Sequence, residues 1–480
     1  MKRTFLTVLT SLCTALVFAG GVENKTNMST GYLRNPSRNT ECSRPEAAFY
    51  NIAGTAFLED GLYVEAGNQF IVKEYGNKLD TNNAYQGYGI KDYYSNDETT
   101  VFFYPDADIV FKKGRWSTFL TFGVYAGGGA LSYSEGTSAT TLMFLGGASK
   151  LKEEAVKFGL AAAAAQQTAA AIPDGYTDPE PNTGMTKEEL TALAQEYGAK
   201  ATLYTNAAGA SLKMAQNHSL DVTSLTLGGQ LGASYLITDW LSLSAAYRYT
   251  FGSQDMVLKC NDLTFCAVNG SNEISYQAKG FGQSMVFGIH AKPPVASGLD
   301  LAIQYQTLSR IDYDVENVKG KVAAFYDITN DSKFRTDLPA VLNLGAGYRV
   351  FDPLYLSLGF NYYFNNFAHQ DSILSETDYD NSWEIAFGAD YRFCKIAGAS
   401  AGLSYSNQGI TDSSNSTFNP VLDSMVYGAG IEFYPVERLT VTLSGMYTQY
   451  FDADYKLQGN NTVLSKDVLL FSLGVTYKFF

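Results

Sequence analysis

Residues 241–251 read LSLSAAYRYTF, so every second side chain is apolar and most of the others are small or polar. The same alternation occurs in LYLSLGFNYYF at 354–364 and in LTVTLSGMY at 439–447. A period of two residues is typical of a β-strand whose two faces meet different surroundings. Soluble sandwiches and membrane barrels share this pattern, so the connections between strands must separate the two fold classes.

The connections favour a barrel. Short turns and long polar loops alternate along the chain, as in an up-and-down antiparallel barrel with short periplasmic turns. Greek-key sandwiches have no reason to sort their connections in this way. About fourteen strands are predicted, near 62–75, 104–113, 115–126, 222–237, 240–256, 273–291, 298–308, 336–350, 354–366, 382–393, 398–409, 424–434, 438–452 and 468–480. The predicted long loops are 76–103, 127–221, 257–272, 309–335, 367–381, 410–423 and 453–467.

The composition agrees with a chain that faces lipid. The 480 residues carry a formal net charge of −14, and only 17% of them are charged, below the ~25% of typical soluble proteins. The 14% aromatic content argues against a disordered chain, and the acidic balance argues against nucleic-acid binding. Beyond the N-terminus there is no apolar run of ~20 residues, which a membrane helix would need. An all-β transmembrane barrel surrounded by outer-membrane lipid is therefore expected.

The N-terminus predicts export. A basic start at Lys2 and Arg3 precedes a mostly apolar stretch that ends near Ala19, so residues 1–20 are expected to be a secretory signal peptide. The alternative is a short anchor helix, although the stretch has too few residues to span a bilayer comfortably. Export and a barrel fold together place the mature chain in the outer membrane of a diderm, Gram-negative-type bacterium.

Residues 21–61 are too long and too polar for a tail of no consequence. A fourteen-stranded barrel has room inside its wall. We expect this segment to be a hatch, or plug, inside a barrel formed by residues 62–480. A disordered periplasmic tail is the alternative.

The loop at 127–221 differs from the others because it is expected to contain two helices. An alanine-rich stretch precedes three prolines, and Thr186 and Glu189 then have the spacing of a capping box. Apolar residues follow Glu189 at helical intervals. This loop is either a lid or capture surface at the barrel mouth or a surface decoration.

Candidate chemistry is sparse. Cys260 and Cys266 flank a polar stretch and could form a disulfide in an oxidising compartment, or remain two free thiols. His218, His290 and His369 match no metal-ligand pattern and are interpreted as incidental polar residues. No Ser/His/Asp arrangement is evident, so neither a catalytic site, a metal site nor a cofactor is expected, and the protein is not expected to be an enzyme.

Two motifs carry a resemblance. AAFYNIAGTAFLEDGL at 47–62 resembles the N-terminal signature of long-chain fatty acid outer-membrane transporters, a family (FadL/TodX type) that includes transporters of aromatic hydrocarbons. Ile52 stands where that family usually has proline. DLPAVLNLGAGYRV at 337–350 is similar to the family's Leu-Pro-Ala strand. The signature residues are Tyr50, Asn51, Ala53, Gly54, Asp60 and Gly61.

The resemblance implies a monomeric fourteen-stranded barrel closed by an N-terminal hatch. It implies passive uptake of hydrophobic molecules, with the fatty acid or aromatic ligand leaving sideways through an opening in the wall. In the family this opening lies at a kink in an early strand, which Gly123 or Gly127 would supply here, because glycine breaks ladder regularity easily. No ligand-contact residue is carried over.

The expected function is therefore a hatch-gated outer-membrane channel for long-chain fatty acids, related lipids or aromatics. The alternative is a general porin or a surface-structural protein without selectivity for hydrophobic substrates. An open porin would conduct ions, whereas a plugged transporter would conduct little.

Overall fold

The computed structural model describes residues 28–80, 92–97, 99–321, 328–371, 379–411, 417, 420–457 and 460–480. The predicted signal peptide at 1–20 lies outside the described residues, as do the first residues of the expected hatch, 21–27.

The described residues form 18 strand segments in one antiparallel sheet. In four cases two consecutive segments continue a single wall strand, as β2 and β3 do along β1, so the wall has 14 strands. The sheet closes on itself through a continuous ladder between β1 (Gly61–Asp80) and β18 (Asn460–Lys478). The prediction of an antiparallel barrel of about fourteen strands is confirmed.

The other segments are the following. They are β2 (Asp92–Asp97), β3 (Thr100–Lys113), β4 (Trp116–Tyr133), β5 (His218–Thr238), β6 (Leu241–Cys260), β7 (Glu273–Ala291), β8 (Leu299–Gln306), β9 (Asp312–Lys319), β10 (Lys333–Arg335), β11 (Ala340–Phe351), β12 (Leu354–Phe364), β13 (Ser382–Cys394), β14 (Ala397–Asn407), β15 (Ser424–Val436), β16 (Leu439–Tyr450) and β17 (Ala453–Leu457).

Side chains on the wall are distributed in the opposite sense to those of a soluble protein. On β6 the apolar residues Leu243, Tyr247 and Tyr249 are each more than 40% exposed. The polar side chains between them, such as Arg248 and Thr250, are buried in the lumen. An apolar exterior and a polar interior are characteristic of a barrel embedded in lipid.

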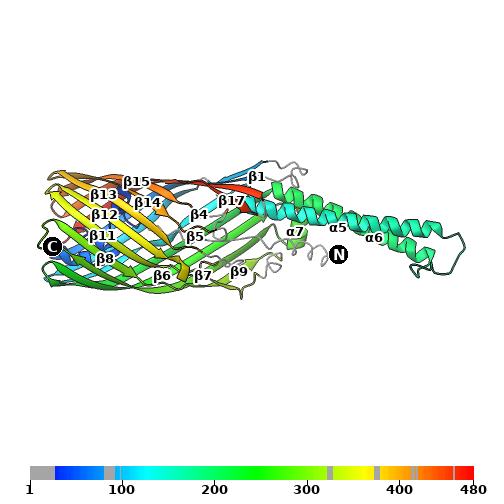
Figure 1. The fold of residues 1–480 in the computed structure, drawn as a ribbon, viewed down its shortest axis with the longest axis horizontal. Helices are drawn as coiled ribbons and strands as arrows, with labels where there is room; N and C mark the ends of the chain where they lie inside the picture. The colour runs from blue at the N-terminus through cyan, green and yellow to red at the C-terminus, as the bar shows by residue number, and fades with distance from the viewer. Residues whose placement is uncertain are drawn as a thin grey trace.

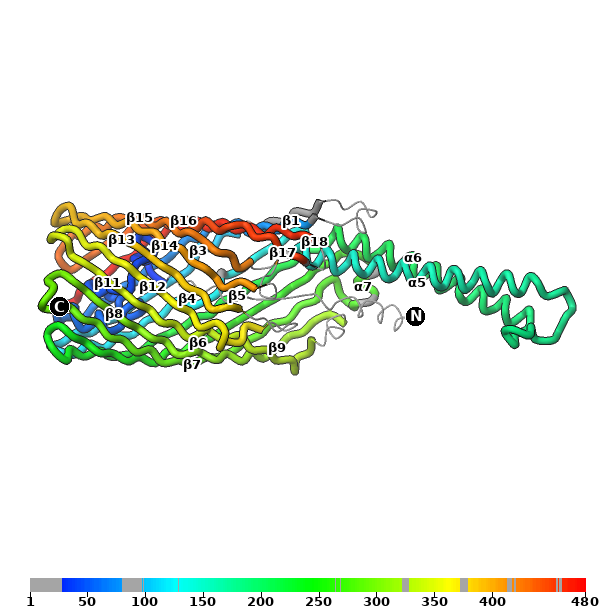
Figure 2. The backbone as a smooth tube through the Cα atoms, viewed as in Figure 1, coloured from blue at the N-terminus to red at the C-terminus, as the bar shows by residue number. Residues whose placement is uncertain are grey.

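The two ends of the barrel differ (Figure 1). Short turns and the C-terminal residue lie at one end, called here the turn end. From the other, the loop end, a hairpin of α5 (Ser138–Ala171) and α6 (Lys187–Gln216) projects far beyond the rim, as Figure 2 also shows. A helix of 34 residues is about 51 Å long. Within the described ranges, no helix is both long and apolar enough to cross a bilayer.

The predicted capping box at the start of α6 is confirmed, since Thr186 and Glu189 bond reciprocally to each other's backbone. Two further elements lie at the loop end, α7 (Leu263–Asn269) and the short turn η3 (Asn365–Phe367).

Several strands are longer than predicted. β5 has 21 residues, and most of the predicted loop 453–467 is strand in β17 and β18. Strands of this length extend past the bilayer, whose apolar band on a barrel is about 25 Å tall. Beyond that band the outer face of a strand no longer meets lipid, so the alternation with an apolar outer face that identifies strands in the sequence is lost.

Residues 28–60, called here the plug, lie inside the barrel near its turn end (Figure 1, blue). The plug contains α2 (Thr30–Arg34), α3 (Ala47–Tyr50) and the 3₁₀ helix η1 (Ile52–Phe57). Ser29 begins α2 by accepting a hydrogen bond from the backbone N–H of Tyr32. The short helices are almost wholly buried against the inner wall. Helices of this length are not stable alone in water, so packing against the wall stabilises them.

Candidate functional site

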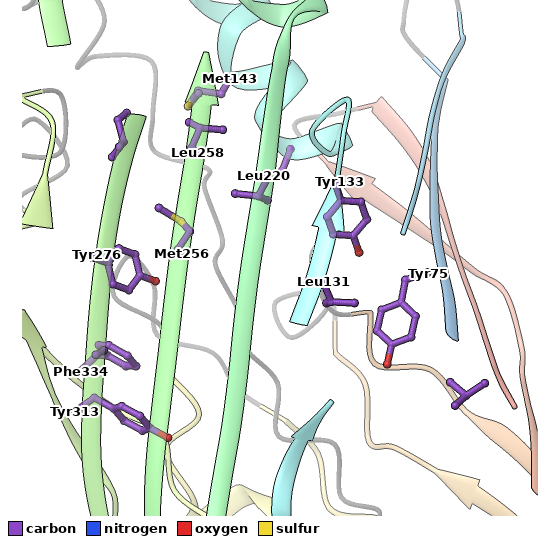
Figure 3. Packing of buried hydrophobic residues seen from close by; sticks show 14 of the residues in the cluster. Tyr75, Leu131, Tyr133, Met143, Leu220, Met256, Leu258, Tyr276, Tyr313 and Phe334 are labelled. Carbon is purple, nitrogen blue, oxygen red and sulfur yellow. The ribbon is translucent and has the colours of Figure 1, made fainter. Parts of the chain in front are cut away.

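The lumen on the loop side of the plug contains a continuous cluster of buried apolar side chains, called here the apolar column. Figure 3 shows part of it, with Tyr and Met side chains of several strands pointing inward. At the loop end the column meets α5, and at the other end it meets Phe49 and Tyr50 of the plug. The labelled members are Tyr75, Leu131, Tyr133, Met143, Leu220, Met256, Leu258, Tyr276, Tyr313 and Phe334.

The outer end of the column is closed by the first turns of α5. Leu142, Phe144 and Leu145 are buried there among wall residues. Met143 and Met256 add flexible thioether side chains, which repack easily around objects of different shape. The column is therefore mainly apolar, with the buried ammonium groups of Lys73 and Lys466 beside the Tyr75 ring, and parts of the same chain lie at both of its ends.

Aromatic contacts join the column to the plug. The Phe49 ring meets the Tyr125 ring edge-on at 5.3 Å, and the Tyr32 and Tyr50 rings stack at 5.6 Å. The guanidinium of Arg248 lies 4.6 Å from the Tyr125 ring centroid and 5.1 Å from that of Phe49. Movement of the plug would therefore change the inner end of the column directly.

Two signature residues, Asn51 and Ala53, connect the plug to the wall, and a third, Tyr50, bonds to the start of the plug. The Tyr50 hydroxyl accepts a hydrogen bond from the Met28 N–H at 2.9 Å. The Asn51 amide donates to His290 Nδ1 at 2.7 Å, and the Ala53 carbonyl accepts from Ser242 Oγ at 2.7 Å. The expected signature is thus part of the contact between plug and barrel.

Ile52, which replaces the usual proline, uses the N–H that proline lacks. Its N–H donates to Gln304 Oε1 at 2.9 Å, while Gln304 Nε2 donates to the Phe49 carbonyl at 3.1 Å. The departure from the family pattern is therefore matched by a partner on β8.

Of the remaining signature residues, Gly54 and Gly61 allow close backbone contacts and Asp60 bonds to a turn of the wall. A Cβ on Gly54 would meet the Glu41 carbonyl oxygen, and one on Gly61 would meet the carbonyl oxygen of Phe480. Asp60 accepts from the Gly114 N–H at 2.9 and 3.0 Å in the β3–β4 turn, and this bond lowers the pKa of its carboxyl group.

Buried ion pairs hold the plug on the opposite side of the lumen. We call this set the arginine clamp: Arg34, Arg38 and Arg44 from the plug, with Asp390 on β13 and Glu432 on β15. Arg34 pairs with Asp390 and, at 3.2 Å, with Glu432; Arg38 meets Asp390 at 3.1 Å. Arg44 pairs with Glu432. Burial alone would lower the pKa of the Arg38 guanidinium, but the surrounding carboxylates raise it above its ordinary value.

Sequence analysis missed the wall half of the clamp. Asp390 and Glu432 lie at inward-facing positions of strands whose other inward residues are small or polar. A carboxylate at that phase of a spanning strand needs a cation in the lumen. The occurrence of a carboxylate at an inward-facing position of a predicted strand was therefore the signal that could have identified Asp390 and Glu432.

The wall has a discontinuity between β3 and β4. Their ladder runs from Lys113–Trp116 to Ala107–Phe122 and ends there among the described residues. Pro105, which has no N–H, follows at this point on β3. Farther out, Lys73 Nζ donates to the Ala130 carbonyl at 2.6 Å. We call the unladdered stretch, 100–106 facing 123–131, the seam.

The two glycines expected to kink the wall both lie at the seam. Gly127 has φ +89° and lies within the second of two register shifts of the β4–β5 ladder, between Ala126 and Gly129, so it marks the irregularity. Gly123 has a different role, because a Cβ there would lie 2.6 Å from Met28 Cε of the plug. Met28 therefore covers the inner side of the seam, and Tyr50 fixes its backbone.

At the turn end the plug borders a polar vestibule of about 1310 Å³. Cys42 of the plug and Asp300 of β8 line it, and His290 lies directly behind them. Burial raises the pKa of the Cys42 thiol to about 12. His290, interpreted from the sequence as incidental, is thus fully buried between the plug and Asp300, which no sequence spacing indicated.

Cys260 ends β6 and Cys266 lies within α7 at the loop end, and both are free thiols in the structure. The Cys266 Sγ lies 3.9 Å from the Cys260 carbonyl oxygen. Their pairing in an oxidising compartment stays a prediction.

Comparisons with known proteins agree with this architecture. The family described as outer membrane protein transport protein (OMPP1/FadL/TodX) matches residues 155–479. A FadL homologue from Pseudomonas aeruginosa has a TM-score of 0.60 at 16% identity, over 97% of this chain and 100% of its own. A comparison with curated proteins gave no match.

Two further solved structures are similar. The toluene transporter TodX of Pseudomonas putida has a TM-score of 0.55 at 12% identity, over 92% of this chain and 96% of its own. The CymD monoaromatic hydrocarbon channel has a TM-score of 0.51 at 11% identity, over 95% of this chain and 99% of its own. At these identities the likeness concerns the fold.

Proposed function

This chain belongs to the outer membrane protein transport family (OMPP1/FadL/TodX), and from that premise we propose that it takes up hydrophobic small molecules passively through its plugged barrel. Family membership places it in the outer membrane of a Gram-negative bacterium, among transport proteins. The short turns then face the periplasm, and the helical hairpin faces outward.

The apolar column is the observation that carries the proposal. A polar solute gains nothing from a lumen lined by Tyr, Leu, Met and Phe, whereas an acyl chain or aromatic ring gains about 0.8 kcal/mol for each CH₂ that it buries. The column gives such a molecule an apolar route past the polar outer leaflet. The buried plug argues against a permanently open, water-filled pore.

We propose the seam as the exit. A hydrophobic molecule that reaches the plug has only a polar vestibule ahead of it, but the seam borders lipid. Phe102 and Phe103 of β3 are more than 70% exposed at this place. Displacement of Met28 would uncover Gly123, where β3 and β4 share no ladder bonds.

The substrate class follows from the column and from the relatives together. Solved relatives are named as a toluene transporter, a monoaromatic hydrocarbon channel and a FadL homologue. Aromatic and flexible thioether linings suit both rings and acyl chains. We propose long-chain fatty acids or aromatic hydrocarbons as substrates, carried by a monomer.

Uptake in cells tests this function. In a Gram-negative host without its own transporters of this family, labelled oleate and labelled toluene are offered with and without the protein, and at least one should show saturable uptake. Met256→Gln, inside the column, should lower uptake several-fold. Met285→Gln, on the outer face of β7, is the matched control and should not.

The alternative of a general porin makes the opposite prediction. Large steady ion currents in planar bilayers, together with uptake that does not saturate and does not respond to Met256→Gln, would contradict the proposed function.

A further inference from the structure

Three different donor side chains meet where the plug touches the wall near the vestibule. Cys42 comes from the plug, His290 from the end of β7 and Asp300 from the start of β8, and their ligand atoms all lie within 4.8 Å of one another. His290 Nε2 is 3.0 Å from Asp300 Oδ1, and Cys42 Sγ is 4.0 Å from the same oxygen. His290 and Asp300 lie ten residues apart on neighbouring strands, whereas Cys42 is 258 residues from Asp300 in the sequence, so the position of the plug in the lumen brings the thiol to this pair.

The donor set is selective. A thiolate, an imidazole and a carboxylate suit zinc and related divalent transition metals, whereas magnesium and calcium prefer oxygen ligands alone. Bond lengths of 2.0–2.3 Å place the ligand atoms of a tetrahedral zinc site roughly 3.3–3.5 Å apart. The separation between His290 Nε2 and Asp300 Oδ1 is shorter than that value, and the separation between Cys42 Sγ and Asp300 Oδ1 is longer. Small side-chain movements would therefore complete a tetrahedral arrangement.

The surroundings provide access to the site and support for the histidine. Cys42 and Asp300 line the vestibule, which supplies both a route for an ion and a water as fourth ligand. A metal on His290 Nε2 leaves the ring proton on Nδ1, which then needs an acceptor. Asn51 Oδ1 is buried beside it and has no hydrogen-bond partner among the described residues. A half-turn of this amide would present Oδ1 to Nδ1 and release the hydrogen bond to the Glu41 carbonyl.

One neighbour competes with a metal ion. Lys292 Nζ lies 3.3 Å from Asp300 Oδ1, on the turn that follows β7. Its ammonium group repels a cation at this carboxylate. The side chain is 39% exposed, so it can swing into the vestibule when an ion arrives.

We propose that Cys42, His290 and Asp300 bind one divalent transition-metal ion of the zinc type and thereby tie the plug to β7 and β8. Binding replaces the thiol proton of Cys42, which leaves to solvent, while the ring proton of His290 moves from Nε2 to Nδ1. A bound ion adds a link between plug and wall beside the signature. The site does not depend on which substrate the barrel carries.

Cobalt titration of the purified full-length protein in detergent tests the site. After treatment with a chelator, Co²⁺ should bind one to one, with a thiolate-to-cobalt absorption band in the near ultraviolet, and Zn²⁺ should displace it. A variant with Cys260→Ser, Cys266→Ser and Cys394→Ser keeps Cys42 as its only thiol after the signal peptide and should retain the band. Cys42→Ser should abolish it.

Lys292→Met distinguishes a metal site from a merely structural contact. Removing the competing ammonium should tighten Co²⁺ binding roughly tenfold, whereas loss of a structural ion pair would weaken it or leave it unchanged. The proposal is overturned if the triple serine variant shows no band, if the band survives Cys42→Ser, or if Lys292→Met fails to tighten binding. The triple variant keeps the test decisive even if Cys42→Ser does not fold.

Discussion

At the scale of single residues, inward-facing charges on the wall hold the plug. Asp390 accepts hydrogen bonds from Asn35 and Ser400 and pairs with Arg34 and Arg38. The arginine side chains are almost completely buried, so each needs a carboxylate nearby. Release of the plug therefore requires these charges to part or to find new partners.

Asp390→Asn should loosen the plug without unfolding the barrel. Removing one partner of a buried ion pair costs roughly 3 kcal/mol, which corresponds to more than a hundredfold lower protection of the plug amides. Hydrogen exchange followed by mass spectrometry over residues 28–60 measures this change.

The matched control for this substitution is Asp239→Asn, in the exposed pair with Arg115 at the turn end. It should leave exchange of the plug unchanged, because exposed pairs contribute little. Equal protection of the plug in wild type and Asp390→Asn would contradict the role of the clamp.

At the residue level, the sequence pattern indicated the signature motif but not the distant partners of its residues. The signature residues Tyr50, Asn51 and Ala53 all contact the wall or the start of the plug. The partner of Ile52, Gln304, could not be found, because nothing local links positions 252 residues apart. The same holds for Cys42 and His290.

At the scale of elements, the helical hairpin has two parts. Near the barrel, α5 buries Leu142 and Leu145 in the apolar column. Farther out, among the residues that the structure describes, α5 and α6 pack against each other through small clusters such as Leu151 with Tyr204 and Ala169 with Leu190. The inner part belongs to the barrel mouth, and the outer part is an independent projection.

Shortening the outer part should therefore leave the barrel intact. Replacing residues 162–196 with a short glycine-rich turn keeps the Phe158–Tyr197 contact and removes the tip. The melting temperature and the uptake of substrate should stay near wild type. Leu145→Ala, at the mouth, should instead cost about 3 kcal/mol of local stability.

These two variants decide between the roles that the sequence left open for this loop. Loss of uptake on removing the tip would contradict the interpretation of the outer part as an independent projection. It would indicate instead that the tip captures substrate. Thermal melting and the uptake assay with labelled oleate or toluene provide the readouts.

Helices and strands could be predicted from the sequence where different surroundings on their two faces impose a regular repeat of apolar residues. The strand centres and the capping box of α6 satisfy simple rules, and the structure confirms them. The start of α5 at Ser138 was missed because residues 138–149 carry no charge, show no amphipathic helical pattern and contain Gly146 and Gly147. Its burial in the barrel mouth supplies the stability that its sequence does not.

At the scale of the whole molecule, closure of the sheet and discontinuity at the seam coexist. The β1–β18 ladder is unbroken, whereas the β3–β4 ladder stops at Ala107 and Phe122. Inside lipid an unpaired strand edge is normally too costly to persist. Here the plug residue Met28 and the side chain of Lys73 lie at the inner side of the seam, and release of substrate through the seam is the proposal that they bear on.

A reversible disulfide across the seam tests this account most directly. A Cβ at position 129 would lie 3.4 Å from Val101 Cγ2, so Val101→Cys and Gly129→Cys together bring two thiols close to each other across β3 and β4, and the Gly129→Cys single variant reports the strain of a cysteine at φ +81°. The account predicts that the oxidised variant loses saturable uptake of labelled substrate and regains it on reduction, while each single variant transports in both conditions. Unchanged uptake by the fully oxidised double variant would contradict lateral release through the seam.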